Sequence, residues 1–169
     1  DGGEIELSHY VHPRAEPEIA FLMKKPLSGP LSPAQAIAAV EAIAPAIEII
    51  DSRYKDFQFS LSDVVADNSS SSGFVVGSWC RPDLDISNMG VVFELDGRAA
   101  QIGSTAAILG HPARSLAAAS RMLGADMLTL EQGWIVMAGG VTTAEPLSAG
   151  VHVRNTVENL GSVSFSVAG

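Results

Sequence analysis

A β-strand is predicted by the apolar run in Glu16-Pro17-Glu18-Ile19-Ala20-Phe21-Leu22-Met23, and the rest of the fold is worked out from this strand. Pro17 has no N–H to donate to a neighbouring strand, so we expect this strand to start at a sheet edge or a bulge. Glu16 and Glu18 are two residues apart and therefore point to one face, with their Cβ atoms roughly 6–7 Å from each other. Two adjacent carboxylates raise each other's pKa unless a cation neutralises them. A solvated strand face is the alternative reading of this spacing.

A third carboxylate lies in the apolar run Ala46-Ile47-Glu48-Ile49-Ile50-Asp51, which predicts a buried strand. A buried carboxylate needs a partner. Together with Glu16 and Glu18, Glu48 would supply the oxygen ligands that suit a hard divalent cation such as magnesium or manganese. Ion pairs of these acids with Arg14 and Arg53 are the competing interpretation.

The rest of the chain predicts a β-dominated α+β fold with two main helices. The first helix is expected over Ala34–Ile43, ended by Pro45, and the second over Pro112–Leu123, ended by Gly124. A polar loop is expected over 63–72, and Asp96-Gly97 predicts a hairpin. Further strands are expected at 73–79, 90–95, 135–138, 151–157 and 162–167.

Length and composition indicate one globular domain and disfavour several function classes. The chain has 169 residues, of which 47% are hydrophobic and 17% charged, and its net charge is −9. That acidity disfavours nucleic acid and anionic membrane surfaces as partners. A single cysteine, Cys80, excludes an internal disulfide, and no apolar run reaches the roughly 18 residues of a membrane span. We therefore expect a cytoplasmic protein.

Several motifs resemble those of the fumarylacetoacetate hydrolase superfamily. Residues 12–21 resemble its E-x-E metal strand, residues 46–53 its third-ligand segment, and residues 65–71 the loop that follows. Residues 135–142 and 160–165 are similar to the group of 2-keto-4-pentenoate hydratases and 4-oxalocrotonate decarboxylases. This resemblance implies a curled mixed β-sheet roll in which Glu16, Glu18 and Glu48 hold magnesium or manganese. The bound ion would chelate a 2-oxo acid.

The resemblance favours a decarboxylase that converts 2-oxohex-3-enedioate (4-oxalocrotonate) to 2-hydroxypenta-2,4-dienoate in the breakdown of aromatic compounds. Asp51 and Asp67 are the expected catalytic residues. The residues expected to bind substrate are Arg53, Asn68, Ser70, His111, Gly140 and Thr142. Simpler roles stay open for some of them: a salt bridge from Arg53 to Asp51, a helix start at His111, a tight turn at Gly140 and an Asx-turn at Asp67.

Two alternatives accompany the decarboxylase hypothesis: a hydratase that adds water to 2-hydroxypenta-2,4-dienoate, and a non-catalytic core that assembles with a partner. The family usually has a further N-terminal segment carrying an active-site lysine and a lid. We expect residues 1–169 to form a single metal-binding catalytic domain without that segment. The resemblance also implies a homo-oligomer and a complex with the hydratase of the same pathway.

Overall fold

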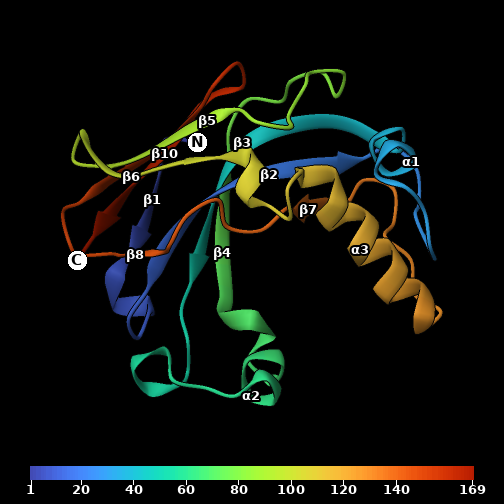
Figure 1. Cartoon of the computed structure of the whole chain (residues 1–169). Helices are drawn as coiled ribbons and strands as arrows, with labels where there is room; N and C mark the ends of the chain where they lie inside the picture. Colours follow the sequence, from blue (N-terminus) through green and yellow to red (C-terminus); the bar gives the residue numbers. More distant parts are fainter.

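Two five-stranded sheets dominate the computed structural model, which describes residues 1–169 (Figure 1). The first sheet has the order β1 (Gly3–Glu6), β10 (Gly161–Ala168), β9 (His152–Val157), β5 (Gly90–Leu95) and β6 (Arg98–Ser104). The second has the order β4 (Ser71–Val76), β3 (Val40–Ile50), β2 (Arg14–Met23) and β7 (Ile135–Met137), with β8 (Glu145–Pro146) also paired to β2. Only β1 and β10 pair in parallel, so the first sheet is mixed, while all strand pairs of the second sheet are antiparallel. The predicted β-dominated α+β class is confirmed.

Helices are few, and only one of them is long. They are α1 (Pro33–Ile37), α2 (Leu61–Ala66) and α3 (Pro112–Ala125), with single 3₁₀ turns η1 (Leu7–His9), η2 (Lys55–Phe57), η3 (Asn68–Ser70) and η4 (Thr105–Ala107). In Figure 1, α2 lies at the bottom of the molecule below β4, while α3 runs down its right side beside α1 and β7. No helix has both the length and the apolar character that a bilayer crossing requires.

The two faces of β2 have different surroundings, which is what positions the site. Ile19, Phe21 and Met23 point to a core that α3 covers with Leu116. Ala15 belongs to a second core between the two sheets, where Phe93 and Phe165 are also buried. Glu16 and Glu18 occupy the alternate positions and therefore point to the other face of the strand.

The first helix is much shorter than predicted, and this part of the prediction is wrong. Helix α1 ends at Ile37, and β3 begins at Val40. Val40 and Ile43 are β-branched, and both pair with β2 and lie buried in the core. Pairing with an existing strand therefore outweighs the weak helical preference of the preceding alanines.

Two prolines lie inside paired strands rather than at their ends. The carbonyl of Pro17 accepts from Val141 N–H and that of Pro45 from Gly77 N–H, both outside the β2–β3 ladder. Since the N–H and C=O of a strand residue point to the same side, neither proline removes a β2–β3 hydrogen bond. Pro17 also lies between the segments of β2 that pair with β7 and β8. Pro45 therefore continues β3 instead of ending a helix.

The second helix extends past its predicted end. Gly124 lies within α3, which runs to Ala125. A Cβ at Gly124 would be 2.2 Å from the backbone nitrogen of Gly29, so the glycine allows the helix to approach the 27–30 turn. The predicted loop at 63–72 also differs, because it includes the last part of α2, the turn η3 and the start of β4. The capping box of α2 joins Ser60 and Asp63.

Candidate metal centre

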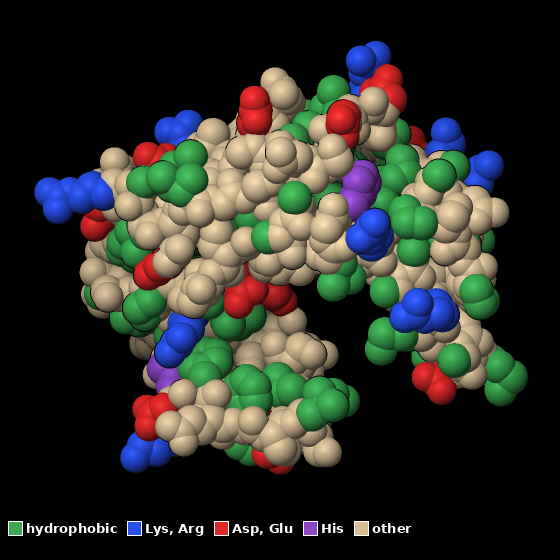
Figure 2. Space-filling model, in the orientation of Figure 1, with side chains coloured by type: hydrophobic (Ala, Val, Ile, Leu, Met, Phe, Trp, Pro, Cys, Tyr) green, Lys and Arg blue, Asp and Glu red, His purple; other side chains and the backbone are tan.

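Three carboxylates from two adjacent strands lie together on the open face of the second sheet. Glu16 and Glu48 are directly opposed in the β2–β3 register, and Glu18 is two residues further along β2. One oxygen from each residue lies within 4.8 Å of the other two. In Figure 2, acidic side chains are visible in the hollow between the lower part of the molecule, which carries α2, and the helix α3. The structure thus brings together the three residues that the sequence selected as metal ligands.

The three acids of this cluster differ in how they are held. Glu18 is 1% exposed, and its Oε2 accepts from the N–H of Gly139 at 2.8 Å. Glu16 contacts the loop after β7 so closely that a Cβ at Gly140 would lie 2.5 Å from its Oε2. Glu48 accepts a hydrogen bond from the hydroxyl of Ser71. Backbone and hydroxyl donors therefore orient the cluster.

Burial and mutual repulsion raise the pKa of two of these acids. Burial is the larger cause for Glu18, and with the repulsion of Glu48 and Glu16 it outweighs the Gly139 hydrogen bond and raises the pKa to about 8. The pKa of Glu16 is raised as well, by burial first and by Glu48 second. Charge is therefore poorly compensated in this cluster.

No basic side chain neutralises the cluster, so ion pairing with arginine is not what holds the acids together. Arg53 is paired with Asp67, and the guanidinium of Arg14 lies over the ring of Phe57, 4.4 Å from its centroid. The other ion pair in the structure joins Arg81 and Asp83. A buried group of carboxylate oxygens without a protein cation fits a hard divalent ion by its donor chemistry.

A cavity of about 390 Å³ adjoins Glu48. Its other lining residues are Asn68, Ser71, Ser72, Gly73, Phe74 and Met137. The sequence analysis selected only Asn68 and Glu48 from this set. Phe74 is the cross-strand partner of Glu48 and remains 55% exposed, which gives the cavity an apolar wall. The sequence gives no local sign that Phe74 lies beside Glu48, because this contact depends on the pairing of β4 with β3.

Arg53 and Asp67 form a second feature beside this cavity. The backbone N–H and guanidinium of Arg53 both donate to Asp67, and the hydroxyl of Ser52 adds a third bond. The Arg53 backbone hydrogen bond is the largest of the effects that lower the Asp67 pKa. The Arg53 side chain is nevertheless 76% exposed and lines a cavity of about 360 Å³, which shares Asn68 with the cavity at Glu48. The partner of Arg53 is thus Asp67, not Asp51.

Two predicted residues lie in structural positions instead. Asp51 accepts from the backbone N–H groups of Val11 and His12, both at 2.8 Å, which leaves neither oxygen free of a protein donor. His111 is the N-cap of α3, where its Nδ1 accepts from Ala113 N–H at 3.0 Å. No hydrogen bond connects either side chain to the carboxylate cluster, and the catalytic role of Asp51 and the substrate-binding role of His111 stay predictions.

The remaining predicted residues lie on the two loops that flank the cluster. Ser70 is buried in η3, and its hydroxyl has no hydrogen-bond partner. The amide of Asn68 donates to the carbonyl of Ser71. Thr142 follows the Gly140 turn, and its methyl group packs so closely on β6 that a Cβ at Gly103 would lie 2.7 Å away.

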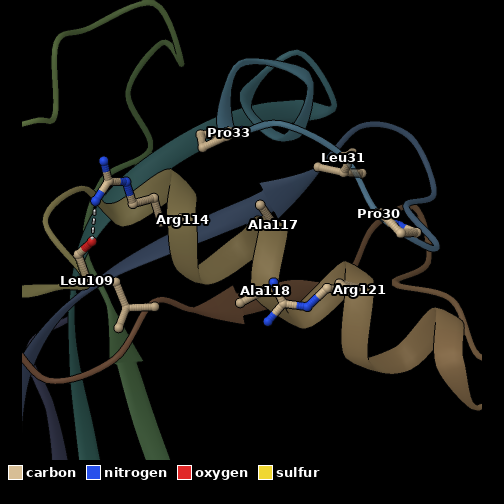
Figure 3. A pocket seen from close by; sticks show the side chains of 8 residues that line it. All are labelled: Pro30, Leu31, Pro33, Leu109, Arg114, Ala117, Ala118 and Arg121. Atoms are coloured by element: carbon tan, nitrogen blue, oxygen red, sulfur yellow. Dashed lines mark hydrogen bonds between the residues drawn. The ribbon is translucent and has the colours of Figure 1, made fainter.

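The largest cavity, about 430 Å³, is separate from the cluster. Figure 3 shows it between the turn at Pro30–Pro33 and α3, with Ala117 and Ala118 on the helix and Arg114 and Arg121 at its rim. Arg114 donates to the carbonyl of Leu109. None of its lining residues is acidic, so this cavity offers no ligands to a cation.

A curled antiparallel sheet with three carboxylates on its open face, packed against a second, mixed sheet, defines a class of metal-binding β-roll proteins. Residues 2–168 match the description "Fumarylacetoacetate (FAA) hydrolase C-terminal", and the chain belongs to this family.

Similar proteins include both decarboxylases and hydratases. A 4-oxalocrotonate decarboxylase of Pseudomonas sp is 57% identical over the whole chain, which covers 66% of that protein. A 2-hydroxyhexa-2,4-dienoate hydratase of Comamonas testosteroni is 34% identical over 98% of the chain and 64% of its own length. The solved structure of 4-oxalocrotonate decarboxylase from Pseudomonas putida G7, complexed with magnesium and adipate, has a TM-score of 0.95 and 38% identity, over 99% of this chain and 65% of that one. The chain spans about two thirds of the length of these relatives.

Proposed function

We propose that this chain is the metal-binding part of a lyase that decarboxylates 2-oxohex-3-enedioate. The observation that carries the proposal is the gathering of Glu16, Glu18 and Glu48 beside a cavity, with no protein cation among them. The 57% identity to a 4-oxalocrotonate decarboxylase and the magnesium in the solved Pseudomonas putida structure support it.

Glu16, Glu18 and Glu48 would hold a divalent cation, magnesium or manganese. When bound, such an ion supplies Lewis-acid stabilisation to a 2-oxo oxygen that gains negative charge as carbon dioxide leaves. The cavity beside Glu48 receives the carbon chain against Phe74 and Met137. Asn68 on η3 lines this cavity and is a neutral donor available to the substrate there.

Arg53 favours a diacid over a monoacid as the substrate. Its exposed guanidinium lines the cavity that continues past Asn68, so a second carboxylate at the far end of the substrate would meet a positive charge. A guanidinium has five N–H donors, and Asp67 uses only part of this capacity. The hydratase substrate 2-hydroxypenta-2,4-dienoate has one carboxylate and would leave Arg53 unused. Asp67 then acts by orienting Arg53.

The test mixes the purified chain with magnesium and 2-oxohex-3-enedioate and follows both the conjugated chromophore and carbon dioxide. Loss of the chromophore with one equivalent of gas supports the proposal. Loss of the chromophore without gas would show hydration instead. Thermal stabilisation by magnesium without turnover would show a non-catalytic core. Glu48→Gln is the control, because it removes one ligand charge while keeping the size of the side chain.

We further propose that the chain assembles with copies of itself and with the hydratase of the same pathway. Large apolar side chains are exposed around the end of α3 and the start of β7, and such surfaces typically mark contacts. They are Met122, Met127, Leu128, Trp134 and Ile135. Light scattering of the chain, alone and mixed with the hydratase, measures both associations; monomers in both samples would refute them.

A further inference from the structure

Four consecutive serines follow α2 and have four different environments. Ser69 lies in the left-handed region with φ of 54°, and Ser70 is buried. The hydroxyl of Ser71 donates to Oε1 of Glu48, while Ser72 is exposed and makes no side-chain hydrogen bond. The sequence analysis selected Ser70 from this run, but the hydroxyl that reaches the carboxylate cluster belongs to Ser71.

A β-bulge places Ser71 on the face of the cluster. In the β3–β4 register, Ile49 pairs with Gly73 and Ile50 pairs with Ser71, so Ser72 is the extra residue. Phe74 opposes Glu48 and shares its face, so strict alternation would place Ser72 on that face and Ser71 on the other. The bulge opposes Ser71 to Ile50, which is on the same face as Glu48. Local strand geometry thus aims this one hydroxyl at Glu48.

Among the three acids, Glu48 is the one that a side-chain hydroxyl orients, whereas backbone groups hold the other two. Glu18 is buried and bound by the Gly139 N–H, and Glu16 is confined by the Gly140 backbone. Glu48 is half-buried at the wall of an open cavity, and Ser71 is the residue outside the three acids whose side chain donates a hydrogen bond to it. Without this bond, its carboxylate would sample several rotamers, and ordering them would oppose ion binding.

We propose that Ser71 is a positioning residue that holds the Glu48 carboxylate in the orientation needed for a divalent cation. The proposal rests on the metal site of the proposed function and adds a residue to it. Hydrogen bonds from residues behind the ligands orient metal-binding carboxylates, and their loss typically costs 10–100-fold in metal affinity.

The experiment measures magnesium affinity by calorimetry in the full chain and in three variants. Ser71→Ala is expected to weaken binding about 10–100-fold, because the hydroxyl is lost. Ser71→Thr retains a hydroxyl and suits a strand, so it is expected to recover most of the affinity. Ser72→Ala is the matched control, since the hydroxyl of this neighbouring serine makes no hydrogen bond to Glu48, and its magnesium affinity is expected to stay within about twofold of the parent.

Two further measurements separate a positioning role from a general structural one. The melting temperature of Ser71→Ala in EDTA is expected to equal that of the parent, and the electron paramagnetic resonance spectrum of bound Mn²⁺ is expected to broaden in this variant alone. Unchanged magnesium affinity in Ser71→Ala would overturn the proposal. A parent chain that binds magnesium but does not decarboxylate would refute only the proposed activity, whereas a parent that binds no magnesium would refute both.

Discussion

Glu18→Gln tests the buried charge on which the candidate site depends. Burial raises the Glu18 pKa to about 8 from its ordinary 4.5. Between these values the metal-free folded chain binds a proton that the unfolded chain does not, so its stability falls as pH rises. The slope is at most about 1.4 kcal/mol per pH unit, or about 5 kcal/mol across the window. Gln is isosteric, stays neutral and can still accept from Gly139.

Urea denaturation in EDTA between pH 5 and pH 9 measures this effect in the parent and in Glu18→Gln. We expect similar stabilities at pH 5, where Glu18 is protonated in the folded chain, and a stability advantage for the variant that grows up to pH 8. All other titrating groups are shared, so the difference between the two proteins measures the titration of Glu18 together with its coupling to Glu16 and Glu48. If the stability curves of the two proteins run parallel across the whole pH range, the raised pKa of the buried Glu18 carboxylate is refuted.

Three further predictions concern the same site and one helix contact. Magnesium affinity should rise between pH 6 and pH 8 and then level off, because the ion must displace the Glu18 proton. Calorimetry in buffers of different ionisation enthalpy should show that binding releases a proton. Binding without proton release would contradict the raised pKa of Glu18. Gly140→Ala should lower magnesium affinity at least about tenfold, since its Cβ would lie 2.5 Å from Glu16 Oε2, whereas Gly3→Ala, with open space around it, should not. Gly124→Ala should destabilise the fold by about 2 kcal/mol in thermal denaturation, because the new Cβ would overlap Gly29. Helix propensity alone would instead stabilise the variant by about 1 kcal/mol, so a measured gain in stability would refute the contact between Gly124 and Gly29.

Short-range patterns in the sequence determined most of the strands and the identity of the three acids. The two-residue spacing of Glu16 and Glu18 and the apolar surroundings of Glu48 are local properties, and the alternation of a strand converts them into a shared face. The Asp96-Gly97 turn is similarly local. It joins β5 to β6 as the predicted hairpin, and both of its residues have positive φ.

Tertiary structure alone decided which elements pair and which side chain of each run reaches the site. Val40 and Ile43 extend β3 because they pair with β2. The local sequence before Pro45 does not indicate this pairing. Arg53 pairs with Asp67 although Asp51 is nearer to it in the sequence, because backbone N–H groups already donate to both carboxylate oxygens of Asp51. Ser70 and Ser71 have the same chemistry, and only the bulge between β3 and β4 directs one of them to Glu48. Each of these pairings joins segments that are distant in the sequence, so local sequence patterns do not predict them.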